Sequence, residues 1–104
     1  MKMSILLDKI SKDLNIPSEE LINRGLLTYL EHEIRMAEED IADIRDKYLV
    51  AERVELEKKI KDKEIYSHPA WEDLIIWENS EAYITKLKNI IKGLKDYPQN
   101  IPTS

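Results

Sequence analysis

The sequence contains no cysteine and no phenylalanine, and only two glycines and two histidines among its 104 residues. The absence of cysteine excludes thiol catalysis, thiolate metal sites and disulfide bonds. The scarcity of glycine excludes a glycine-rich phosphate loop, because Gly25 and Gly93 each stand alone. No apolar run is long enough for a signal peptide or a membrane span, so we expect a cytoplasmic protein with no membrane association.

Charged residues make up 36% of the chain, and the formal net charge is -5 at pH 7. The acidic excess is spread evenly along the sequence, and no half of the chain is basic. A generic nucleic-acid surface is therefore not favoured, whereas a basic protein partner suits the chain well. At this length we expect one domain with a modest core, and helical hairpins of this size often complete their burial by oligomerising or binding a partner.

The strongest pattern is an alternation of three and four positions between apolar residues over residues 27–48. These residues are Leu27, Leu30, Ile34, Ala37, Ile41, Ile44 and Tyr48. A period of 3.5 residues places a continuous apolar stripe along one side of a helix, and such a stripe packs against another helix. We therefore predict a long helix that begins near Ser18, where serine after Pro17 can act as a cap, and continues at least to Tyr48.

The phase of this stripe is lost after Tyr48. We therefore predict a bend or short break within residues 48–52, followed by a helix over residues 52–63. A further helix is predicted from Pro69 to about Leu94, because proline is favoured at the first helical position. Its apolar stripe includes Trp77, Ile84, Leu87 and Ile91.

Together these elements predict an all-α fold: a long antiparallel helical hairpin, similar to a coiled coil, with a short N-terminal helix over residues 4–14. The seam between the long helices consists of Leu27, Leu30, Ile34, Ile41, Ile44, Tyr48, Trp77, Ile84, Leu87 and Ile91. The same stripe could pair with its copy in a second chain, and composition does not decide between the two arrangements. We expect one helical domain over residues 1–97 and a flexible tail over residues 98–104.

Both glycines fall in predicted helices, where glycine costs about 1 kcal/mol relative to alanine. Gly25 lies inside the first long helix, so we expect another backbone, such as that of the N-terminal helix, to approach it closely. Gly93 lies near the predicted end of the last helix, where we expect it to act as the C-cap.

Signals for catalysis are few. His68 and Glu72 are four residues apart at a helix start, and this spacing lets two side chains reach one metal ion. No second pair of ligands completes such a site. The Glu-x-x-His pattern of carboxylate metal bundles is also absent, because Tyr29 and Ile65 stand three residues before the two histidines. We therefore predict no catalytic residue, no metal site and no cofactor, and a protein that is not an enzyme.

Both tryptophans lie in one short segment, residues 65–79, whose apolar residues cover more than one side of a helix. Trp77 fits the seam, but Trp71 and Ile75 point elsewhere, toward the N-terminal helix, a second subunit or a partner. The segment is therefore either the most buried part of the core or a binding surface. Aromatic anchors ringed by carboxylates are typical of a hot spot for a basic partner. The candidate partner-binding residues are Trp71, Glu72, Asp73, Ile75 and Glu78.

Residues 10–30 resemble the second half of a ribbon-helix-helix module, with the break at Pro17 between two helical patterns. In that family a leading strand pairs in a dimer and reads the major groove of DNA. Only nine residues precede Ile10 here, and groove-reading basic residues are not evident. The resemblance implies an alternative function, a dimeric DNA-binding transcriptional regulator that uses residues 1–30.

A wider resemblance covers most of the chain. It rests on the helix start Ile16–Leu21, the charged helix that ends in Lys47-Tyr48, and the turn Glu64–Asp73 with the following Trp77–Asn79. In these features the chain is similar to small helical proteins of archaea and bacteria associated with toxin–antitoxin loci, although Leu49 stands where they have a glycine. The resemblance implies a non-catalytic, antitoxin-like protein that binds and neutralises a co-encoded partner, such as a toxin ribonuclease. From the apolar surface that the hairpin leaves over, we also expect a homodimer.

Overall fold

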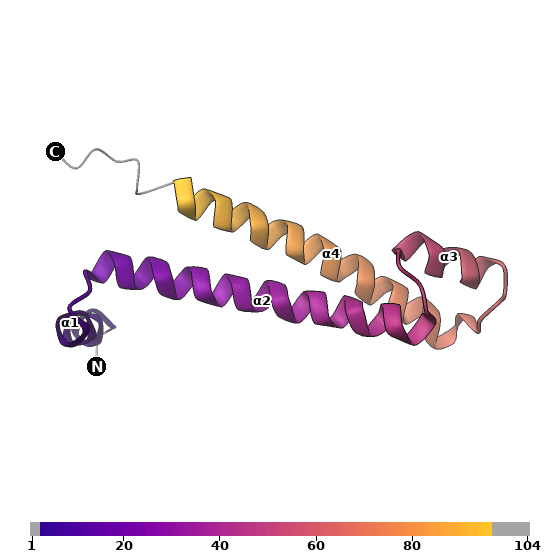
Figure 1. Cartoon of the computed structure of the whole chain (residues 1–104), viewed down its shortest axis with the longest axis horizontal. Helices are drawn as coiled ribbons and strands as arrows, with labels where there is room; N and C mark the ends of the chain where they lie inside the picture. Colours follow the sequence, from indigo (N-terminus) through magenta and orange to yellow (C-terminus); the bar gives the residue numbers. More distant parts are fainter. Residues whose placement is uncertain (1–2, 97–104) are drawn as a thin grey trace.

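The computed structural model describes residues 3–96, which form four helices and no strand. The helices are α1 (Met3–Leu14), α2 (Ser18–Tyr48), α3 (Arg53–Lys61) and α4 (Ser67–Asp96). α2 and α4 run antiparallel as a long hairpin, and α3 packs against α4 at one end, which we call the closed end (Figure 1). α1 lies at the other end, which we call the open end. The predicted all-α hairpin with a short N-terminal helix is confirmed.

Two predicted helix starts can be compared with the structure in detail. α4 becomes regular helix at Pro69, as predicted, because His68 has extended backbone angles (φ -120°, ψ 120°). Ser18 is the first residue of α2 rather than its cap, since Pro17 (φ -55°, ψ 142°) precedes the helix and no side chain caps it. The division into a domain and a tail stays a prediction, because residues 97–104 lie outside the described residues.

The first three helices end in the same way, although none of them ends in glycine. A residue just after each helix adopts a left-handed conformation: Asn15, Leu49 and Lys63, with φ of 56°, 55° and 59°. In each case the next N–H donates to the carbonyl five residues earlier, from Ile16 to Ser11, Val50 to Arg45 and Glu64 to Lys59, at 3.0, 3.1 and 3.0 Å. This arrangement satisfies the last carbonyls of a helix and usually has glycine at the left-handed position. Here asparagine, leucine and lysine adopt that conformation despite their Cβ atoms.

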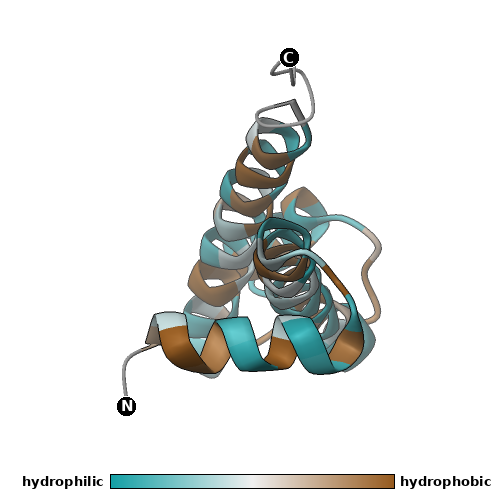
Figure 2. Cartoon of the chain, turned by 90° about the vertical axis from the view of Figure 1, so that its left-hand side faces the viewer, coloured by the Kyte–Doolittle hydropathy of each residue, from teal (hydrophilic) through white to brown (hydrophobic). Residues whose placement is uncertain are grey.

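Close packing does not explain why glycine occupies position 25 or position 93. Apart from the adjacent residues and the nearby backbone of the same helix, no atom lies within 4 Å of the position that a Cβ would take at Gly25 or at Gly93. The prediction that another backbone approaches Gly25 is wrong, because α1 lies crosswise at the open end instead of folding back along α2 (Figure 2). The prediction that Gly93 caps α4 is also wrong, because the helix continues to Asp96.

The core lies at the closed end, where three helices enclose it. Trp77, Leu56 and Leu74 are the largest fully buried side chains. They form one cluster with Ile41, Ile44 and Val50. Val50 belongs to the link between α2 and α3, so the left-handed turn that precedes it also brings an apolar side chain into the core.

The molecule is long and thin. Its Cα radius of gyration is 20.3 Å and its extents are 62 × 31 × 19 Å, whereas a compact domain of about 100 residues has a radius of gyration of about 13 Å. Toward the open end α2 and α4 face each other without a third helix between them, and α1 has no buried residue. Two helices alone bury one stripe each, so the other sides of the hairpin stay exposed.

Candidate protein-binding site

The predicted seam joins α2 to α4 within one chain. Each of its residues, from Leu27 on α2 to Ile91 on α4, is buried or half-buried. Tyr48 and Ile84 pack against the buried cluster at the closed end. The seam residues of the two helices therefore cover each other, and this stripe is not free to pair with a second chain.

Trp71 and Ile75 lie on the surface of α4. Their exposed fractions are 48% and 46%, whereas Trp77 is fully buried. The two residues are one helical turn apart and so share one side of the helix. Residues 65–79 were predicted to be either the most buried part of the core or a binding surface. Trp77 lies in the core, whereas Trp71 lies on the surface. α1 does not reach them, because it lies at the opposite end of the molecule (Figure 1).

Glu78 lies on the same side of α4, three residues after Ile75 and seven after Trp71, and half of its side chain is exposed. The Arg53 guanidinium of α3 lies 4.0 Å from Glu78, and its Nε donates to Glu81 at 2.9 Å. The hydrogen bond to Glu81 is the main cause that raises the pKa of Arg53, and Glu78 adds to it. We call Trp71, Ile75 and Glu78 the Trp71 patch.

Asp73 points toward α2 and bonds within the fold. Lys47 Nζ donates to Asp73 Oδ2 at 2.8 Å, and the Tyr48 hydroxyl donates to the same oxygen. Burial raises the pKa of Asp73, but the hydrogen bonds from Lys47 and Tyr48 together outweigh it and hold the pKa below the ordinary value of 3.8. The bond to Asp73 raises the pKa of Lys47, while burial and then Asp73 raise that of Tyr48. Asp73 therefore links α4 to the end of α2, and its role in binding a partner stays a prediction.

Glu72 lies at the edge of the Trp71 patch. Each residue of a helix advances by about 100° around the axis, so Glu72 lies about 100° from Trp71 and about 60° from Ile75. Its Oε1 lies 3.5 Å from Nε2 of His68, and both side chains are largely exposed. The structure therefore divides the five predicted residues into the Trp71 patch, an internal contact at Asp73 and an exposed pair at Glu72.

Across residues 3–96, no three side chains of the types His, Cys, Asp or Glu gather closely enough to hold a metal ion. His68 and Glu72 supply two groups at the surface and no third. None of the described helices combines the length and the apolar character that a bilayer crossing requires. The chemistry available at the Trp71 patch is apolar contact together with hydrogen bonding to a carboxylate.

A second apolar surface follows another side of the hairpin, and the pattern of the seam does not predict it. We call it the second stripe. Its half-exposed residues are Ile22, Leu26, Tyr29, Met36, Ile76, Tyr83 and Ile90. A signal for it exists in the sequence, because six of these residues form two rows with a spacing of seven. Spacing alone does not show that the rows of two different helices face the same side.

Comparisons with known proteins give one match. No curated protein and no solved structure matches the chain. A protein family matches residues 1–97, a range that includes all four described helices. Its description names neither toxin–antitoxin loci nor ribbon-helix-helix proteins, so both resemblances stay predictions. With nearly its whole length matched, the chain belongs to the Uncharacterized protein MJ0235 family.

Proposed function

We propose that the chain is a non-catalytic protein-interaction module whose Trp71 patch binds a basic protein partner. One observation carries this proposal: Trp71 and Ile75 are half-exposed, one turn apart, on a helix whose other side is buried in the core. A partner that covers these side chains removes a large apolar area from water. Tryptophan is also enriched among the residues that dominate binding energy at interfaces.

The best-packed part of the molecule supports the patch. Trp77 and Leu74 of the same helix are fully buried, and Leu56 of α3 belongs to the same cluster. A surface that is already held in place loses little conformational entropy on binding, so more of the contact energy contributes to affinity. This support favours the closed end over α1, which has no buried residue.

Carboxylates give the patch its preference for a basic partner. The first half of α4, residues 67–81, contains four acidic residues and no lysine or arginine. Glu78 and Glu72 are at least half exposed there. An acidic field attracts a basic partner before contact and repels an acidic one. Arg53 offsets part of this field through Glu78 and Glu81.

The antitoxin-like part of the proposal rests on the resemblance to proteins of toxin–antitoxin loci. A ribonuclease needs a basic surface to hold the phosphates of its RNA. An acidic protein that covers this surface would inhibit the enzyme without any chemistry of its own. The Trp71 patch offers the apolar anchor for such a contact, and the surrounding carboxylates offer the charge.

The alternative function, a dimeric DNA-binding regulator that uses residues 1–30, has less support. Residues Met3–Leu14 are helical, whereas a ribbon-helix-helix protein has a strand before its first helix. Residues 1–30 contain four basic and four acidic side chains and so carry no net positive charge. A DNA-binding segment is expected to be basic.

The proposal is tested by capture of the partner and measurement of its affinity. The tagged full-length chain is purified from its native host at moderate salt, and mass spectrometry identifies what accompanies it. We expect a small basic protein in stoichiometric amount. Calorimetry then measures its Kd for the wild type, for the double variant Trp71→Ala/Ile75→Ala, and for the control Ile5→Ala. The control removes an apolar side chain that is 58% exposed on α1.

We expect the double variant to bind at least about tenfold more weakly, and the control to bind like the wild type. Circular dichroism should show that all three proteins remain helical. A folded double variant that keeps full affinity contradicts the proposal, and so does recovery of the chain alone. Recovery of promoter DNA that is lost as the salt concentration rises would support the alternative function.

A further inference from the structure

We infer that two copies of this chain pair through the second stripe to form an antiparallel four-helix bundle. The inference is independent of the proposed function, because the second stripe and the Trp71 patch occupy different sides of α4. Ile76 follows Trp71 by five positions, which places the two side chains about 140° apart around the helix axis. A partner can therefore occupy one side while a second copy occupies the other.

The second stripe consists of two rows with the spacing of helix-to-helix packing. The row on α2 contains Ile22, Tyr29 and Met36, with Leu26 beside it, and the row on α4 contains Ile76, Tyr83 and Ile90. The exposed fractions of these residues lie between 38% and 58%. Residues that recur every seven positions form a continuous seam for another helix. The spacing therefore fits an occupant that is itself made of helices.

The two rows flank the same groove of the hairpin. The Tyr83 hydroxyl donates to Glu33 Oε1 at 2.8 Å, from α4 to α2. Met36 and Ile76 line one groove together with Tyr83. The hydrogen bond to Glu33 is the main cause that raises the pKa of Tyr83, and Tyr29 adds to it. Tyr83 therefore faces Glu33, which lies about one turn along α2 from Tyr29.

Each row of the stripe is symmetric about its own tyrosine. Each row has a tyrosine at its centre and an aliphatic residue seven positions to either side, and each row is about 21 Å long at 1.5 Å per residue. A two-fold axis that crosses α4 at Tyr83 brings this tyrosine opposite its own copy. The same rotation places Ile76 of one copy opposite Ile90 of the other. The occupant whose own row matches the row on α4 in this way is therefore a second copy of the chain.

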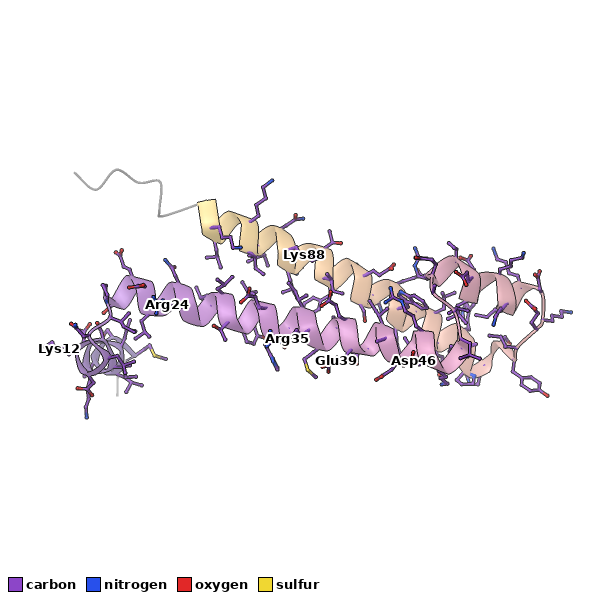
Figure 3. All side chains as sticks on the ribbon, viewed as in Figure 1. Lys12, Arg24, Arg35, Glu39, Asp46 and Lys88 are labelled. Carbon is purple, nitrogen blue, oxygen red and sulfur yellow. The ribbon has the colours of Figure 1, made fainter. Side chains whose placement is uncertain are left out.

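Charge selects the same antiparallel arrangement. The first half of α4, residues 67–81, contains four acidic residues and no lysine or arginine, whereas residues 82–95 contain four lysines and no acidic residue. The lysine-rich half extends toward the open end, as the position of Lys88 in Figure 3 shows. The two-fold rotation lays this half along the acidic half of the other α4, where opposite charges attract. A parallel pair would instead place the two acidic closed ends together.

The size of the stripe also agrees with a dimer. Seven large side chains, each about half exposed, offer several hundred Å² of apolar surface, which is as much as the largest patch of a typical monomer. A stable interface buries about 800 Å² per partner, and polar residues at its rim supply part of that area. Pairing would give the thin open half of the hairpin the enclosed core that it lacks as a single chain.

Single introduced cysteines test both the pairing and its direction, because the chain contains no cysteine of its own. A disulfide requires two Cα atoms within about 7 Å. Tyr83→Cys lies near the inferred axis, and we expect it to form a disulfide-linked dimer under mild oxidation. The two copies of Ile90→Cys would lie about 21 Å apart and should stay unlinked. A mixture of Ile90→Cys and Ile76→Cys should form the mixed disulfide.

Sedimentation equilibrium supplies the second measurement. We expect the wild type at micromolar concentration to have twice the monomer mass of 12.3 kDa. Tyr83→Lys should be monomeric with its helical circular dichroism intact, because an unpaired charge opposes burial. Trp71→Lys, the matched change on another side of α4, should stay dimeric. A monomeric wild type at about 0.1 mM, or faster disulfide formation by Ile90→Cys alone than by Tyr83→Cys, overturns the inference.

Discussion

The two ends of the hairpin contain similar apolar residues but differ in how well they are packed. At the closed end α3 covers the start of α4, and Leu56 and Trp77 have no exposed surface. At the open end α1 has no buried residue, and Ile5 and Leu14 are 58% and 56% exposed. The difference shows why a helical hairpin needs a third element: two helices bury one stripe each, and a third helix encloses the space beside them.

The ends also differ in their polar contacts. At the closed end Trp77 Nε1 donates to Glu81 at 3.2 Å, and the Arg45 guanidinium lies 5.5 Å from the centroid of the Trp77 ring. Asp73 joins α4 to α2 in the same region. At the open end the Ser11 hydroxyl donates to the carbonyl of Ile16, a contact within the link from α1 to α2. Polar groups therefore join different helices at the closed end and neighbouring residues at the start of the chain.

The largest expected effect separates the two ends directly. Trp77→Ala removes a fully buried side chain and leaves a cavity, so we expect the free energy of unfolding to fall by about 3–5 kcal/mol. Ile5→Ala should change it by less than about 0.5 kcal/mol, because the side chain is exposed. Trp71→Ala is the matched tryptophan control and should fall between them. Urea denaturation followed by circular dichroism measures the free energy of unfolding of all three variants. Equal decreases for Trp77→Ala and Ile5→Ala would contradict the difference in packing between the two ends.

A smaller effect tests the polar contact at the closed end. Asp73→Asn removes the negative charge of the carboxylate that accepts hydrogen bonds from Lys47 and Tyr48. We expect the free energy of unfolding at pH 7 to fall by about 1 kcal/mol. The pKa of Asp73 is lower in the folded chain than in the unfolded chain. Its contribution is therefore complete above about pH 4 and is lost as the pH falls through the folded pKa. The stability gap between the wild type and Asp73→Asn should close in acid.

Glu39→Gln is the control for this pH dependence. Glu39 is exposed on a side of α2 that faces away from α4, and its substitution changes the charge equally (Figure 3). Urea denaturation at pH 7 and at about pH 3 compares the three proteins. A gap for Asp73→Asn that stays unchanged in acid would contradict the contact. In alkali the dependence on pH runs the other way. The pKa values of Tyr48 and Lys47 are raised in the folded chain, so the stability that these groups contribute is present below about pH 10 and is lost as the pH rises above it.

The smallest effect concerns the turn that leads into the closed end. Leu49 has a φ of 55° and an exposed side chain. Leu49→Gly removes the Cβ that disfavours this conformation, although glycine gains entropy in the unfolded chain, so we expect a net stabilisation of about 0.5 kcal/mol. Leu49→Ala keeps the Cβ and should leave the stability nearly unchanged. Thermal unfolding measures the melting temperatures of both variants. An equal shift of the melting temperature for glycine and for alanine would mean that the Cβ of Leu49 causes no strain in the left-handed turn.

The helices and the seam could be predicted because their signals are local. The period of 3.5 residues up to Tyr48 and the proline at position 69 both act within a few residues, and both predictions agree with the structure. The break was predictable to within residues 48–52, but its geometry was not. Leucine has no preference for a left-handed turn, and the turn at Leu49 coincides with the burial of Val50 among residues of α3 and α4.

The candidate site follows from the sequence in part. Trp71, Ile75 and Glu78 share one side of α4 for reasons of helical spacing alone, so their grouping needs no tertiary information. Asp73 is a neighbour of Glu72 in the sequence, but its bonds to the end of α2 depend on how the two long helices meet. The second stripe also depends on how α2 packs against α4, since its two rows belong to these two different helices.

The sequence by itself determined which segments are helical and which stripe joins α2 to α4. Helix formation depends on residues a few positions apart, and a seam repeats along a single helix. Only the tertiary structure decided that α3 and not α1 completes the core, that no backbone approaches Gly25, and that Trp71 is exposed while Trp77 is buried. These features depend on contacts between segments far apart in the chain, and no local pattern of residues specifies which of several apolar surfaces another segment will cover.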